Sequence, residues 1–75
     1  MNALVKRSLS LSGHRTSVAL EAEFWLALES LAEREGCSLR TLIADIDAGR
    51  DAATPLASAL RVQALLRAGW DGSQK

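Results

Sequence analysis

Few side chains in this chain are suited to acid–base, nucleophilic or metal chemistry. There is one histidine, His14, and one cysteine, Cys37. His14 has no Cys, Asp or Glu at a spacing that metal ligands use, and Cys37 has no base close to it in the sequence. Asp45 and Asp47 are two positions apart, so their carboxylates do not face each other on a helix. We therefore predict no catalytic residue, no metal site and no cofactor, and we do not expect an enzyme.

The side chains that remain for chemistry are cations close to the N-terminus. Residues 1–20 contain Lys6, Arg7 and Arg15 without an acid, whereas residues 21–35 contain five glutamates and one arginine. The net charge is zero, which weakens a case for nucleic acid, because neutralisation of phosphates supplies essentially all non-specific affinity. One end of a neutral protein can still bind an anion, since the Debye length is only about 8 Å at physiological salt.

A strand must position Arg15. Residues 15–20 alternate with a period of two, which predicts a half-buried strand. A lone strand leaves its backbone N–H and C=O groups unpaired, so a second strand must come from the N-terminus of the same chain or from another copy. Residues 8–12 also alternate, and Gly13-His14 fits a two-residue turn with glycine first. The pairs of a hairpin closed there are Ser12 with Arg15, Leu11 with Thr16, Ser10 with Ser17 and Leu9 with Val18.

After the strand, the spacing of the apolar residues changes to a helical period, which predicts three helices. They cover residues 22–35, 39–48 and 55–68, and each ends at a glycine. Ser38 is a predicted N-cap, and Thr54-Pro55 combines an N-cap with proline at the first helical position. Trp70 is either a clamp on the last helix or an exposed contact. The apolar positions of the three helices are Phe24, Trp25, Leu28, Leu31 and Ala32, then Leu39, Leu42, Ile43 and Ile46, then Leu56, Leu60, Val62, Leu65 and Leu66.

The length of 75 residues suffices for one small domain. We place it at residues 8–70, between a flexible N-terminus at 1–7 and a disordered tail at 71–75. The hydrophobic fraction of 48% is high for this length, and a dimer interface would cover much of that surface. The single cysteine fits a reducing compartment. Neither a signal peptide nor a run of about 20 apolar residues is visible, so we expect a cytoplasmic protein without a membrane span.

The order strand, helix, Gly-x-Ser turn, helix resembles the ribbon-helix-helix superfamily of Arc, MetJ and CopG repressors. The resemblance covers about residues 15–48. It rests on Val18-Ala19-Leu20 before the first helix, Leu28, Leu31 and Ala32 within it, Gly36-Cys37-Ser38 in the turn, and Leu42-Ile43 in the second helix. Residues 13–21, Phe24-Trp25 and Ser58-Ala59-Leu60-Arg61 are similar to a small bacterial subgroup that appends a third helix.

The resemblance implies a mainly α fold with a short N-terminal β-ribbon, built as an intertwined homodimer with an extra C-terminal helix. In this superfamily two chains pair their strands, and the outer face of the ribbon enters the major groove of double-stranded DNA. The implied function is a DNA-binding transcription regulator. The matching positions are Arg15, Ser17 and Ala19 for the bases, Ser38, Arg40 and Thr41 for a phosphate at the second helix, Lys6 and Arg7 for an arm along the DNA backbone, and His14 for at most another phosphate.

The same residues have plainer interpretations. Arg15 can be a solvated charge, Ser38 only an N-cap, and Lys6 with Arg7 a solubilising terminus. If residues 8–12 pair with the strand in each chain, the dimer sheet is about 19 Å wide. The major groove is only about 12 Å wide. Either residues 6–12 then detach on DNA, or the outer face binds something else. The rival functions are an antitoxin-like or adaptor dimer that binds a protein through the last helix and the sheet surface, and a structural oligomer built through residues 8–12.

Overall fold

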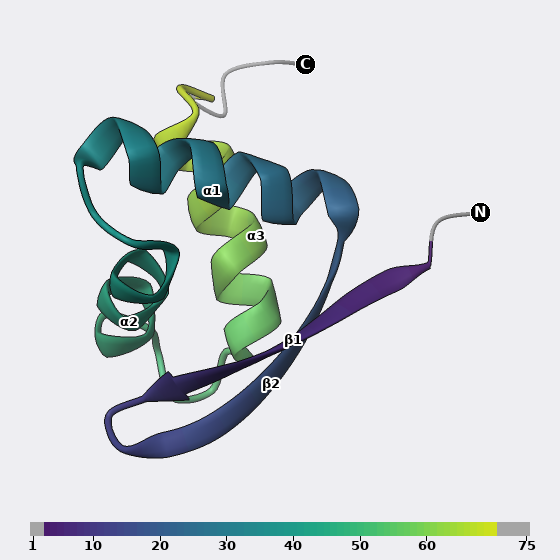
Figure 1. The fold of residues 1–75 in the computed structure, drawn as a ribbon, viewed down its shortest axis with the longest axis vertical. Coiled ribbons are helices and arrows are strands. Elements are labelled where there is room, and N and C mark those ends of the chain that lie inside the picture. The colour runs from purple at the N-terminus through teal and green to yellow at the C-terminus, as the bar shows by residue number, and fades with distance from the viewer. Residues whose placement is uncertain (1–2, 71–75) are drawn as a thin grey trace.

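The computed structural model describes residues 3–70, whereas residues 1–2 and 71–75, including the predicted tail, lie outside the described part. The elements are β1 (Leu4–Leu11), β2 (His14–Glu21), α1 (Ala22–Glu35), α2 (Leu39–Ala48) and α3 (Leu56–Arg67). The strands form an antiparallel hairpin along one side of the molecule, and the helices pack on one face of it (Figure 1). The prediction of an N-terminal ribbon followed by helices, with a third helix added, is confirmed. The homodimer stays a prediction.

β1 of the same chain supplies the second strand, which was one of the two possible sources. β1 starts at Leu4, four residues earlier than the alternating segment 8–12 indicated. Lys6 and Arg7 therefore lie inside a hydrogen-bonded ladder and do not form a separate arm. The whole two-stranded ribbon is thus present in a single chain.

The hairpin turns at Ser12-Gly13 and not at the predicted Gly13-His14. Both turn residues have positive φ, 51° and 79°, as a two-residue type I′ turn requires. Leu11 therefore pairs with His14, and Leu9 pairs with Thr16, so the predicted pairs were wrong by two residues. Because side chains alternate with a period of two, a slip of two residues leaves every side chain on its predicted face.

The helix bounds follow the caps that the sequence contains. α1 and α2 match their predicted ranges, and Gly36 ends α1 in the left-handed conformation with a φ of 72°. α3 begins at Leu56, one residue after the predicted start, because Pro55 has an extended backbone and occupies the N-cap position. Thr54 is therefore not the cap, and its carbonyl instead accepts a hydrogen bond of 2.7 Å from Arg50 Nη1.

The core lies between the hairpin and the helices and closes within one chain. The side chains without exposed surface come from four elements: Leu20, Leu28, Ile43 and Leu60. Trp25 is 1% exposed, and its Nε1 donates a hydrogen bond of 2.7 Å to the carbonyl of Val5. This bond satisfies the buried indole and ties β1 to α1.

α3 faces the core with a narrower stripe than its sequence indicated. Leu60 and Ala64, one turn apart, are buried. Val62, Leu65 and Leu66 are exposed and point away from the core, so only some of the apolar positions of this helix are buried. An uncovered apolar surface is left along α3.

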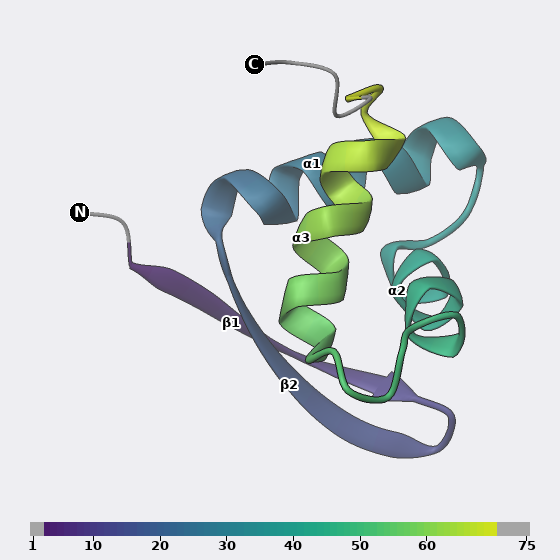
Figure 2. The same ribbon diagram turned by 180° about the vertical axis from the view of Figure 1, so that it is seen from behind.

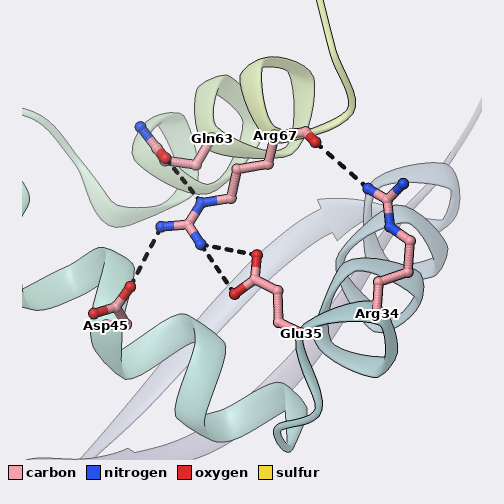
Figure 3. A network of polar contacts seen from close by, with 5 residues as sticks. All are labelled: Arg34, Glu35, Asp45, Gln63 and Arg67. Carbon is pink, nitrogen blue, oxygen red and sulfur yellow. Dashed lines mark hydrogen bonds and ion pairs between the residues drawn. The ribbon is translucent and has the colours of Figure 1, made fainter.

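The C-terminal half of α3 is held to both other helices by Arg67 (Figure 3). Its guanidinium contacts Glu35 of α1 at 3.1 Å and Asp45 of α2 at 3.3 Å. It also donates to Gln63 at 3.0 Å, and Arg34 donates to the Arg67 carbonyl at 3.4 Å. Exposed ion pairs contribute little one by one, but a network that joins three helices fixes their relative positions.

Candidate nucleic-acid interface

The outer face of the hairpin, which points away from the helices, carries a set of polar and cationic side chains. β2 contributes Arg15, Ser17 and Ala19, as predicted from the alternation. β1 places a partner opposite each: Ser10 opposite Arg15, Ser8 opposite Ser17 and Lys6 opposite Ala19. The hydroxyls of Ser8 and Ser17 lie 3.2 Å apart. The structure thus brings Lys6 onto the same face as Arg15, which the sequence did not indicate because the predicted strand began only at residue 8.

Arg7 does not belong to this face. It lies on the helix side of β1, where its guanidinium contacts Glu29 at 2.7 Å and stacks over the Trp25 ring at 4.7 Å. Both contacts hold β1 against α1. Arg7 was predicted as a DNA contact together with Lys6, but neighbouring residues of a strand point to opposite faces. The structure therefore separates the two residues.

His14 also lies apart from the outer face. It is the first residue of β2, opposite Leu11, and it is exposed. The alternation puts it on the side of Thr16 and Val18, at the turn end of the hairpin. A contact from His14 to a phosphate would have to be made at the rim of the hairpin.

The N-terminus of α2 forms a second candidate contact. The Ser38 hydroxyl accepts a hydrogen bond of 3.0 Å from the Thr41 N–H and lies 2.9 Å from the Thr41 hydroxyl. This confirms Ser38 as the N-cap. Arg40 and Thr41 are exposed in the first turn, and helix geometry leaves the N–H groups of Leu39 and Arg40 without an acceptor in the helix. Figures 1 and 2 show α2 above the turn end of the hairpin.

The role of Ser38 can be tested with two substitutions. Ser38→Ala is expected to lower the free energy of unfolding by about 1 kcal/mol, because it removes the cap. Ser38→Asp is expected to keep the stability, because aspartate caps equally well. If α2 also holds a phosphate, Ser38→Asp will weaken DNA binding through charge repulsion, whereas unchanged binding would leave Ser38 as a cap alone. Urea denaturation and DNA titration measure the two effects separately.

The cations of residues 3–70 differ in their contacts, and the side chain of Arg34 donates only to the Arg67 carbonyl. Arg7, Arg50, Arg61 and Arg67 each form an ion pair with an acid of the same chain. The side chains of Lys6, Arg15 and Arg40, in contrast, make no hydrogen bond or ion pair with another residue between 3 and 70. All three were predicted DNA contacts. The cations whose side chains have no partner among residues 3–70 are therefore those on the outer face and at the start of α2.

The acidic residues lie mostly away from this interface. α1 carries Glu23 and Glu33 on its exposed side. Figure 1 shows α1 at the end of the molecule opposite the turn that joins β1 and β2. Glu21, at the far end of β2, pairs with Arg61 of α3 at 2.9 Å. That hydrogen bond from Arg61 lowers the pKa of the Glu21 carboxyl below its usual value. The glutamates of α1 therefore lie apart from the turn end of the hairpin, where Arg15 is located.

The other surface features of the described residues offer weaker sites. A pocket of about 550 Å³ lies between α2, the α2–α3 connection and α3. Its arginines, Arg50 and Arg67, are already paired with Asp47 and with Glu35 and Asp45. Within residues 3–70 no three His, Cys, Asp or Glu side chains gather as metal ligands, and no helix is long and apolar enough to cross a membrane.

Known proteins resemble both the sequence and the fold. The family model described as a ribbon-helix-helix domain matches residues 4–68. Among solved structures, an uncharacterized protein from Bordetella pertussis Tohama I is similar, with a TM-score of 0.71, 37% sequence identity and 85% of this chain covered. This chain spans 54% of that protein. No curated protein matches the chain. Since the family pattern extends from β1 to the end of α3, the chain belongs to the ribbon-helix-helix domain family.

Proposed function

We propose that the protein is a homodimeric regulator that binds double-stranded DNA with the outer face of its hairpin. Ribbon-helix-helix domains are generally DNA-binding transcription regulators or antitoxins, and they are typically homodimers. The observation that carries the proposal for this chain is the set of cations without an intrachain partner among the described residues. Lys6, Arg15 and Arg40 all lie at positions predicted for DNA. The cytoplasm is the proposed location.

The dimensions of the hairpin support insertion into DNA. Two strands lie about 4.8 Å apart. The major groove, about 12 Å wide, admits a two-stranded ribbon. Because β1 and β2 come from one chain, each protomer presents a complete ribbon. A sheet of about 19 Å, which is too wide for the groove, forms only if β2 also pairs with a strand of a second copy.

The outer face supplies both kinds of contact that recognition needs. The Arg15 guanidinium can donate two hydrogen bonds to guanine O6 and N7, and Ser17 can donate or accept. Ala19 can touch a thymine methyl. Lys6 and Arg40 provide charge for phosphates, which position the protein without reading sequence.

Arg15→Ala is expected to weaken binding to the preferred site by about 1–3 kcal/mol and to relax specificity there. Lys6→Ala is expected to weaken binding to all sequences alike and to reduce the salt slope by about one unit. Fluorescence polarisation on specific and scrambled duplexes, at several salt concentrations, measures both effects. Duplexes are first selected from genomic fragments.

Arg7→Ala is the matched control, because Arg7 follows Lys6 in sequence but faces α1. Its salt slope should equal that of the native protein, although its stability should fall slightly. If the native protein shows no salt-dependent binding to any duplex at micromolar concentration, the proposed DNA binding is wrong. If Arg7→Ala and Lys6→Ala change the slope equally, the assignment to the outer face is wrong.

A second candidate function is an antitoxin-like or adaptor dimer that binds another protein. The exposed apolar residues of α3 favour it, since a contiguous uncovered apolar surface on a small domain usually marks an interaction site. This candidate predicts no salt-dependent DNA binding. The polarisation titration therefore separates the two functions.

A further inference from the structure

The centre of the outer face carries a pair of serine hydroxyls, one from each strand. Ser8 of β1 lies directly opposite Ser17 of β2, both residues are exposed, and their Oγ atoms are 3.2 Å apart. The two-residue turn makes Leu11 and His14 the first hydrogen-bonded pair of the ladder, so Ser8 and Ser17 form a non-hydrogen-bonded pair. Side chains lie closest together in such pairs, and the ladder therefore holds the two hydroxyls side by side.

The two hydroxyls together present one donor and one acceptor to the outside. Each serine hydroxyl has one hydrogen to donate and two lone pairs that accept. One hydroxyl of the pair donates its hydrogen to the other, and either serine can be the donor. One hydrogen is then left on the accepting hydroxyl, and free lone pairs are left on the donating hydroxyl. A donor and an acceptor therefore lie next to each other on the outer face.

The neighbouring side chains allow this pair to come close to a base. The long side chains of the face, Lys6 and Arg15, lie on different strands and on either side of the pair along the hairpin. The two other neighbours, Ser10 and Ala19, are small. A serine hydroxyl lies close to its own backbone, so it reaches a base edge only where the strands lie deep in the groove. The small neighbours permit this approach, while the two cations can bind DNA at the ends of the contact.

We propose that Ser8 and Ser17 act as one unit that recognises adenine in the major groove. The inference rests on the proposed function and deepens it, because it names a base that the outer face selects. Of the four bases, only adenine shows an acceptor, N7, beside a donor, the N6 amino group, in the major groove. Guanine shows two acceptors there, O6 and N7, whereas the serine pair has one hydrogen left to donate. Ser8 of β1 is thus a specificity-determining residue, although the base contacts implied by the sequence all lay in β2.

Strand geometry gives the position of the adenine in the site. The Ser8–Ser17 pair lies two residues along the hairpin from the pair that contains Arg15. Two residues of a strand span about 7 Å. Successive nucleotides of one DNA strand are about 3.4 Å apart along the helix axis. The adenine is therefore expected about two base pairs from the guanine that Arg15 binds.

Two other roles for the hydroxyls make different predictions. A cross-strand hydroxyl pair can serve only to stabilise the hairpin, to which such pairs contribute modestly. Loss of either hydroxyl would then leave the preference for each base unchanged. Alternatively, Ser17 can contact a base without Ser8, in which case only a substitution of Ser17 would change the preference. The three roles therefore differ in base preference, and not merely in affinity.

The test is fluorescence polarisation on the selected duplex and on versions that carry each other base pair at each position. The native protein should prefer adenine to guanine about tenfold at one position. Ser8→Ala and Ser17→Ala should each remove most of that preference at the same position, because a single hydroxyl can turn to donate or to accept. The double variant should lose no more than either single variant, since the two hydroxyls act as one unit.

A modified base and a matched variant serve as controls. The base 7-deaza-adenine has a carbon in place of N7 and still pairs with thymine. At the assigned position it should weaken binding of the native protein several-fold and leave binding of Ser8→Ala nearly unchanged. Thr16→Val removes a hydroxyl next to Ser17 in sequence, but from the helix side of β2, so it should keep the native preference. Circular dichroism confirms that each variant is folded.

The outcomes separate the serine pair from DNA binding as such. If the native protein binds no duplex in a salt-dependent manner, the proposed function is wrong and the assignment to the serine pair is wrong with it. If the native protein binds DNA without preferring adenine at any position, or if Ser8→Ala keeps that preference, only the assignment to the pair is overturned. The same holds if Ser8→Ala weakens binding to all duplexes equally.

Discussion

Leu20→Asp is expected to unfold the chain. Leu20 is 0% exposed and lies on the helix side of β2, within the core of a single protomer. An unpaired carboxylate there would lose its hydration without gaining a partner, which costs several kcal/mol. A chain of this length has a total stability of about 4–11 kcal/mol. Far-ultraviolet circular dichroism and urea denaturation should show loss of the cooperative transition.

Ala19→Asp provides the matched control. It introduces the same residue, an aspartate, one position earlier, on the outer face of the hairpin and opposite Lys6. An aspartate there meets a lysine across the ladder, so the fold should persist, while DNA binding should weaken through repulsion of phosphates. A Leu20→Asp protein that melts like the native chain would show that this part of the core is not closed as the structure indicates.

Local signals in the sequence predicted the helices and the faces of the strand. Gly36 and Ser38 determine where α1 ends and α2 begins, through backbone conformation and capping that depend only on neighbouring residues. The turn was less well determined, because Ser12-Gly13 and Gly13-His14 both contain a glycine that suits a tight hairpin. The faces survived this error, since the two registers differ by two residues.

The role of Arg7 and the inward side of α3 could not be predicted from local patterns. Arg7 contacts Glu29 and Trp25, which are distant in sequence and are brought close only when β1 packs on α1. α3 has more apolar positions than one stripe needs, so Leu60 and Leu66 were equivalent candidates for burial. The docking of α3 on β2, and not its own sequence, decides that Leu60 is inside.

Removal of α3 is expected to abolish cooperative folding. Truncation after Arg50 deletes Leu60 and Ala64 from the core, together with the arginines that pair with Glu21 and Glu35. The single substitution Leu60→Ala should already lower the free energy of unfolding by about 2–5 kcal/mol, because Leu60 is fully buried.

Leu26→Ala is the control for Leu60→Ala, because it deletes the same atoms from a leucine that is 65% exposed on α1. Its free energy of unfolding should stay within about 0.5 kcal/mol of the native value. Urea denaturation of the two variants and of the truncated chain measures all three effects. If the truncated chain keeps a native-like transition, α3 is an accessory helix and the fold is complete with the hairpin, α1 and α2. If instead Leu60→Ala is costly and Leu26→Ala is not, α3 is part of the folding unit, because its buried leucine then contributes to the stability of the whole chain.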